Sequence, residues 1–169
     1  MEREVAWKSY TDAERAHLEQ VSARYRAFLD NGKTERECVT EVVKLAEAKG
    51  YTNLEDKIAR GEALKAGDKV YSDWMGKSIM LFIIGKAPME KGINILGAHI
   101  DSPRIDVKQN PLYEDGGLAY LDTHYYGGIK NYQWVTIPLA LHGVVVKKDG
   151  TVVTISVGED ENDPVFCVS

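Results

Sequence analysis

The chain has 169 residues, of which 44% are hydrophobic and 28% charged, the balance of a soluble globular protein. A net charge of −5 argues against a nucleic-acid surface, which needs clustered Lys and Arg, and no apolar run reaches the ~18 residues of a membrane span. The charged start MEREVAWKSY lacks the apolar stretch of a signal peptide, and Cys38 and Cys167 lie far apart, so we expect a cytoplasmic protein with reduced thiols.

Two helices are predicted at the start of the chain. Thr11 and Glu14 have the spacing of a capping box, and apolar residues then recur at helical intervals. Thr34 and Glu37 repeat the same pattern before a second apolar stripe. A glycine ends each predicted helix. We expect the apolar faces of both helices to cover one face of a sheet.

Three strands are predicted next, at residues 69–74, 78–85 and 93–100. A short turn joins the first two as a hairpin. The apolar runs IMLFII and INIL are continuous rather than alternating, which is typical of strands covered on both faces. Because the two helices can cover only one face, we expect these runs to meet protein of another chain or to form an exposed apolar patch.

The rest of the chain, from about Ile105, is predicted to be β throughout. Residues 134–146 and 151–158 flank Asp149-Gly150, which supplies the turn of a hairpin. The run VFCV near the end begins another strand pattern. The predicted sheet lacks a second layer of helices, so we expect the chain to be the N-terminal portion of a longer protein, or one piece of a nicked one.

His99 and Asp101 follow the third predicted strand and are the candidate site residues. Side chains two apart in an extended segment point to the same side, so both are expected at the carboxyl end of the sheet, where α/β proteins bind ligands. A neutral imidazole is a zinc ligand, and a carboxylate beside it can orient the ring. The alternative is a histidine bonded to a loop carbonyl and an aspartate that starts the turn before Pro103. From this short motif alone, the alternative is favoured.

Three other histidines are weaker candidates for a metal site. His17 lies beside the apolar stripe of the first helix and is predicted to be solvated or to cap the helix. His142 alternates with apolar residues on a strand and is predicted to be packed. His124 has glycines nearby that allow close backbone approach, so a metal or substrate role stays open beside the favoured structural one.

Two further side chains have a chemical and a structural interpretation. Arg104 follows the His-x-Asp and could meet a substrate carboxylate, but a salt bridge to Asp106 or another acid is favoured. Cys38 lies in the second predicted helix without a partner base, which argues against a reactive thiolate.

Three long segments then carry a resemblance: GAHIDSPRID (97–106), YYGGIKNYQW (125–134) and IPLALHGVVVKKDG (137–150). They are similar to the bacterial branch of the M18 family of metalloaminopeptidases, which includes the aspartyl aminopeptidases, and the resemblance extends over the whole chain. It implies an α/β fold class: a zinc-exopeptidase-like catalytic domain with a mixed sheet, followed by a β-rich lid and dimerisation domain. Residues 1–112 would be the N-terminal part of the catalytic domain and 113–169 the start of the lid domain.

The resemblance also implies a function. M18 enzymes remove single residues from peptide N-termini with a water activated between two zinc ions. On this pattern His99 would ligate zinc, and Asp101 would be the catalytic aspartate that orients His99. No substrate-binding residue can be assigned, and a preference for acidic or for neutral N-terminal residues is left open.

The family's other metal ligands and its glutamate base have no counterpart in these residues. A catalytic zinc needs three protein ligands, so the chain by itself is expected to be inactive. The expected partners are a peptide substrate and further copies of the protein through the lid domain, with no nucleic acid and no membrane. The alternative is a non-catalytic assembly or interaction module that keeps the fold.

Overall fold

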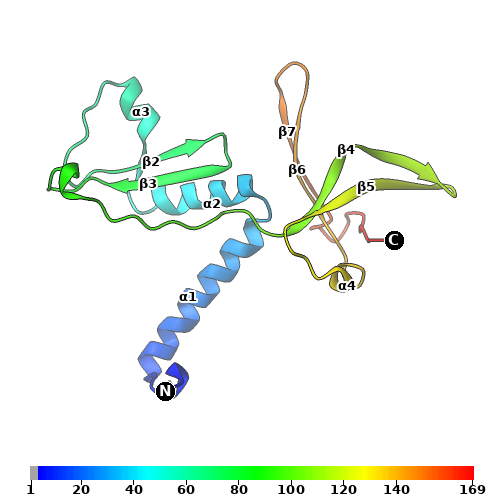
Figure 1. Ribbon diagram of the computed structural model, residues 1–169, viewed down its shortest axis with the longest axis horizontal. Coiled ribbons are helices and arrows are strands. Elements are labelled where there is room, and N and C mark those ends of the chain that lie inside the picture. The colour runs from blue at the N-terminus through cyan, green and yellow to red at the C-terminus, as the bar shows by residue number, and fades with distance from the viewer. Residues whose placement is uncertain (1–3) are drawn as a thin grey trace. The chain divides into compact units, whose positions relative to one another are not determined.

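The computed structural model describes residues 4–169, and its contacts divide the chain into two compact units, Met1–Ile100 and Asp101–Ser169. The first unit contains, in chain order, η1 (Ala6–Lys8), α1 (Asp12–Asn31), α2 (Glu35–Glu47), β1 (Thr52–Asn53), α3 (Leu54–Ala59), β2 (Lys69–Trp74), β3 (Ser78–Ile83) and η2 (Met89–Lys91). The second contains β4 (Arg104–Asp115), β5 (Leu118–Tyr126), α4 (Asn131–Trp134), β6 (Leu141–Val146) and β7 (Val152–Val157), all labelled in Figure 1 except the η turns and β1. The assignment of residues 1–112 and 113–169 to two domains stays a prediction.

Both predicted capping boxes are present. The Thr11 hydroxyl accepts from the backbone N–H of Glu14, and the Glu14 carboxylate accepts from the N–H of Thr11 at 2.8 Å. Thr34 and Glu37 make the same reciprocal pair at the start of α2, with the corresponding N–H to carboxylate distance 2.9 Å. Each box satisfies backbone donors that a helix leaves unpaired, which is why α1 and α2 begin where they were predicted to begin.

The first unit is built on a mixed sheet, as the resemblance implied, but one of its three strands, β1, was not predicted. Its strand order is β1-β2-β3, with β1 parallel to β2 and β2 antiparallel to β3. The predicted hairpin runs in register from Lys69 opposite Ile83 to Trp74 opposite Ser78. Met75 and Gly76 turn the chain with φ of 59° and 66°, the left-handed conformation that tight turns require.

The core of the first unit lies between α2 and β2. Its buried hydrophobic residues are Cys38, Val39 and Ala46 of α2 and Val70 and Tyr71 of β2. The helix α1 contacts α2, and none of its residues is buried. The expectation that both helices cover the sheet was therefore wrong for α1, whose apolar stripe is left half-exposed in the described part of the chain.

Residues 93–100 do not form the predicted third strand. This segment has no regular secondary structure, and Ile95 keeps 78% of its surface exposed. A strand exists only where a neighbour completes its hydrogen-bond ladder, and no strand within residues 4–169 pairs with this segment. The apolar side chains of β3 from Met80 to Ile83 are exposed as well, with Ile83 at 64%. The expected exposed apolar surface is thus confirmed.

The second unit consists of two antiparallel hairpins. β4 pairs with β5 around Gly116-Gly117, both at positive φ, and β6 pairs with β7 around the predicted Asp149-Gly150 turn. The prediction of β structure throughout was wrong at α4, a single helical turn where the first strand of the second hairpin was expected to begin. The run VFCV forms one isolated bridge, between Phe166 and Leu139, rather than a strand.

Candidate functional site

The two predicted site residues fall on either side of the boundary, along the chain, between the two units. His99 is exposed in the irregular segment between η2 and β4, at the end of the first unit, and Asp101 is half-buried at the start of the second. The proposed pairing of the Asp101 carboxylate with the His99 ring therefore stays a prediction.

Within the second unit, Asp101 belongs to a group of interacting side chains. The hydroxyl of Tyr126 donates a hydrogen bond of 2.7 Å to Oδ2 of Asp101. The guanidinium of Arg104 lies over the Tyr126 ring, 4.2 Å from its centroid, and its Nε donates to Oδ1 of Asp106 at 2.7 Å. We call Asp101, Arg104, Asp106 and Tyr126 the Asp101 cluster. The favoured interpretation of Arg104, a salt bridge to Asp106, is confirmed.

Strand pairing brings the cluster together. Arg104 and Tyr126 are directly opposite each other where β4 begins and β5 ends. The next residue, Gly127, has a φ of 71°, and a Cβ there would approach Pro103 to 3.4 Å. A larger residue would be strained in this conformation, so glycine allows the chain to turn just after Tyr126. Tyr126 was missed as a site residue, because the sequence alone does not give the register that places it near Asp101.

The other three histidines have structural roles or are exposed. His17 is exposed on α1, as predicted. His142 is packed, with its side chain 13% exposed and Nε2 2.9 Å from Oε1 of Glu159. His124 is exposed, and its Nδ1 lies 3.1 Å from the carbonyl oxygen of Tyr125.

His99 and Asp101 are of residue types that occur at zinc sites, where a carboxylate often orients a ligating imidazole. Their number is smaller than a catalytic centre requires. Within residues 4–169, no group of three or more His, Cys, Asp or Glu side chains is placed to hold a metal ion. The described residues therefore fit part of a zinc site in kind, with His99 as the candidate ligand.

The comparison with known proteins identifies the family. The model described as aminopeptidase I zinc metalloprotease (M18) matches residues 28–169, which include His99 and the Asp101 cluster. The chain belongs to the M18 family. It is 62% identical over 164 residues to the probable M18 family aminopeptidase 1 of Clostridium acetobutylicum, a match that covers 97% of this chain and 35% of that protein.

Solved M18 structures share the fold. The aminopeptidase I from Clostridium acetobutylicum is 60% identical with a TM-score of 0.84, and the match covers 100% of this chain and 37% of that one. The aminopeptidase I from Borrelia burgdorferi is 40% identical with a TM-score of 0.87, covering 95% of this chain and 39% of the other. The chain thus spans little more than a third of the length of these M18 proteins. No helix within residues 4–169 has the length and apolar character to cross a membrane.

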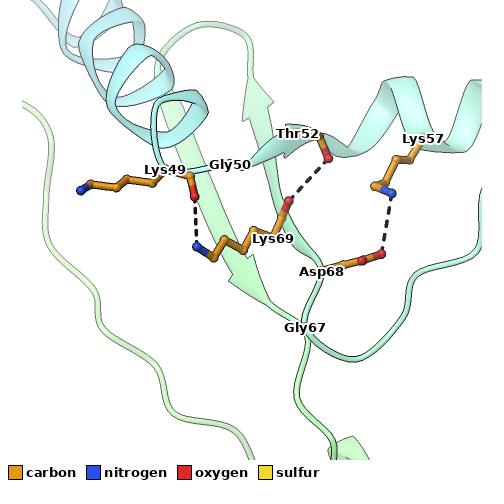
Figure 2. A pocket seen from close by; sticks show the side chains of 7 residues that line it. All are labelled: Lys49, Gly50, Thr52, Lys57, Gly67, Asp68 and Lys69. Carbon is orange, nitrogen blue, oxygen red and sulfur yellow. Dashed lines mark hydrogen bonds and ion pairs between the residues drawn. The ribbon is translucent and has the colours of Figure 1, made fainter.

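A polar hollow of about 320 Å³ in the first unit of the M18 chain contains no predicted site residue (Figure 2). Its lining residues are Lys49, Gly50, Thr52, Lys57, Gly67, Asp68 and Lys69. Lys57 pairs with Asp68 at 3.7 Å, and Nζ of Lys69 donates to the carbonyl oxygen of Lys49 at 3.0 Å, just past the end of α2. Lys57 and Lys69 are thus engaged by the chain itself, and their contacts tie α3 and the end of α2 to the segment that begins β2.

Cys38 of the M18 chain is structural. Cys38 belongs to α2 and its side chain is buried, with Sγ 3.5 Å from the carbonyl oxygen of Gly32. Burial raises the pKa of the Cys38 thiol, and Glu37 and Glu35 raise it further. A raised pKa leaves less thiolate at a given pH, so the argument against a reactive Cys38 holds.

Alkylation kinetics test this assignment. We expect iodoacetamide to modify Cys38 more slowly in the folded chain than in the urea-unfolded chain, with the folded rate profile displaced to higher pH. The exposed Cys167 serves as an internal control for reagent activity, resolved by peptide mass spectrometry. Equal rates for Cys38 in the folded and unfolded chains would contradict the assignment.

Proposed function

We propose that the chain forms part of a zinc-dependent aminopeptidase that removes single residues from the N-termini of peptides. The observation that carries the proposal is the family match over residues 28–169, which includes the whole segment holding His99 and Asp101. The 62% identical relative is named an M18 family aminopeptidase, which supports the same reaction class.

In this proposal His99 holds zinc and Asp101 accepts the remaining ring N–H of His99, which keeps the imidazole neutral and oriented. Zinc in a centre of two ions supplies Lewis-acid polarisation of the scissile carbonyl and activation of a water molecule. The other ligands and the general base would come from outside the described residues, and so the isolated chain is proposed to be inactive.

The proposed substrates are peptides with a free N-terminus. Arg104 gives no support for a preference for acidic N-terminal residues, because its guanidinium is already engaged by Asp106. We further propose that the protein assembles as a homo-oligomer through the β-rich region from residue 113 onward. The exposed apolar side chains of β3 lie outside this region and support burial of the first unit against additional protein. A cytoplasmic location stays a prediction.

The proposal can be tested in a chimaera in which residues 1–169 replace the matching third of the Clostridium acetobutylicum relative. The identity of 62% makes this exchange conservative. We expect the M18 chimaera to bind zinc and to hydrolyse amino-acid p-nitroanilides and short peptides. The isolated chain is expected neither to bind zinc stoichiometrically nor to hydrolyse these substrates. Activity is followed by absorbance and zinc by plasma mass spectrometry.

Two results would count against the proposal. Stoichiometric zinc binding with hydrolysis by the isolated chain would contradict the claim that its site is incomplete. An inactive M18 chimaera beside an active Clostridium acetobutylicum protein would favour the alternative, a non-catalytic assembly module that keeps the fold.

A further inference from the structure

The Asp101 carboxylate is held by a phenol. Oη of Tyr126 donates to Oδ2 of Asp101 over 2.7 Å, a short distance typical of a hydrogen bond to a charged oxygen. The terminal torsion of an aspartate is soft, so an isolated carboxylate turns readily about its last bond. A donor bound to one oxygen fixes the plane of the carboxylate and therefore the direction of the other oxygen.

Tyr126 is itself held in place by its neighbours. The Arg104 guanidinium stacks on the Tyr126 ring at 4.2 Å, an arrangement stabilised by the attraction between the cation and the ring face. Arg104 is anchored by Asp106 at 2.7 Å and by the carbonyl oxygen of Ser102 at 3.3 Å. The Tyr126 hydroxyl is thus placed on Asp101 by the pairing of β4 with β5 and by a chain of contacts that ends on Asp106.

We propose that Tyr126 is a positioning residue for the aminopeptidase reaction, which acts by orienting Asp101 through its hydroxyl. The inference rests on the proposed function, because it takes Asp101 as the residue that orients His99. Tyr126 makes no contribution to the chemistry by itself. Partners of this kind beyond the metal ligands typically change metal affinity or activity by about 10–100-fold when they are removed.

The test is Tyr126→Phe in the M18 chimaera, which removes the hydroxyl and leaves the ring under Arg104. We expect kcat to fall by about tenfold or more with KM within about twofold, and zinc affinity, measured by competition with a chelator, to weaken about tenfold. Tyr125→Phe is the matched control. Tyr125 is the adjacent tyrosine of β5 with 65% of its surface exposed, and its variant should match the parent in all three quantities.

A double-mutant cycle separates orientation of Asp101 from a general effect on the fold. Because Tyr126 acts through Asp101, adding Tyr126→Phe to an Asp101→Asn chimaera should cause no further loss of zinc affinity or of residual kcat. A Tyr126→Phe chimaera with parental kcat and zinc affinity would overturn the inference. So would a penalty of the same size in the Asp101→Asn background.

The same experiments distinguish failure of the proposed function from failure of the inference about Tyr126. An inactive parent chimaera, or full activity after loss of His99, overturns the proposed function and with it the role of Tyr126. An active, His99-dependent parent whose Tyr126→Phe variant behaves like the Tyr125→Phe control overturns the inference alone.

Discussion

We expect replacement of His99 by alanine in the M18 chimaera to abolish peptide hydrolysis. The expected loss of kcat exceeds about 100-fold, because removal of a metal ligand should cost more than removal of the groups that merely orient ligands, which costs about 10–100-fold. Zinc content should fall in parallel, since a catalytic zinc has few protein ligands and each contributes directly. Hydrolysis of an alanine p-nitroanilide and zinc analysis of the same samples provide the two measurements.

His17→Ala is the control for this prediction. His17 is an exposed histidine on α1 that is not among the predicted site residues. The same substitution there should leave activity and zinc content at the parental level. If the parent chimaera is active and its His99→Ala variant shows near-parental turnover, then His99 is not a zinc ligand.

The second large effect concerns stability and is expected at Tyr71. This side chain is 5% exposed in the core between α2 and β2, and its hydroxyl donates to Oε1 of Glu47, the last residue of α2, at 2.8 Å. Tyr71→Ala should lower the free energy of unfolding of the chain by about 3 kcal/mol through the lost packing and the cavity it leaves. Urea titration followed by circular dichroism measures the change.

Two further variants show which contacts of Tyr71 contribute to the free energy of unfolding. Tyr71→Phe keeps the ring and removes the hydrogen bond, so it should cost only about 1 kcal/mol. Tyr25→Ala, on the exposed stripe of α1, should change the free energy of unfolding by less than about 0.5 kcal/mol. If Tyr25→Ala proves as costly as Tyr71→Ala, then α1 is packed in solution and the core lies elsewhere.

The hydroxyl of Tyr71 also predicts the direction of a pH effect. Burial raises the pKa of Tyr71, and the hydrogen bond to Glu47 raises it further. The folded chain therefore favours the protonated phenol. The contribution of this phenol to stability is fully present at pH values below the ordinary pKa of tyrosine. It is lost as the pH rises through the raised pKa of Tyr71 in the folded chain.

Local features were the most predictable part of this fold. The capping boxes at Thr11 and Thr34 and the hairpin turns depend on residues within a few positions of one another, so they can be recognised without knowing what packs around them. The same reasoning failed for residues 93–100. An apolar run is compatible with a strand, but the ladder needs a partner that no strand within the described residues supplies.

The candidate site divides in the same way. The sequence by itself determined the His-x-Asp pair at 99 and 101 and the family in which it occurs, because both depend on the identity and order of residues. The sequence also favoured the salt bridge from Arg104 to Asp106, two positions away on the same strand. Tertiary structure alone decided that Tyr126, twenty-five positions beyond Asp101, donates to the Asp101 carboxylate. The physical reason is register: a one-residue shift between β4 and β5 would turn Tyr126 to the other face of the hairpin, and no local pattern reports that pairing.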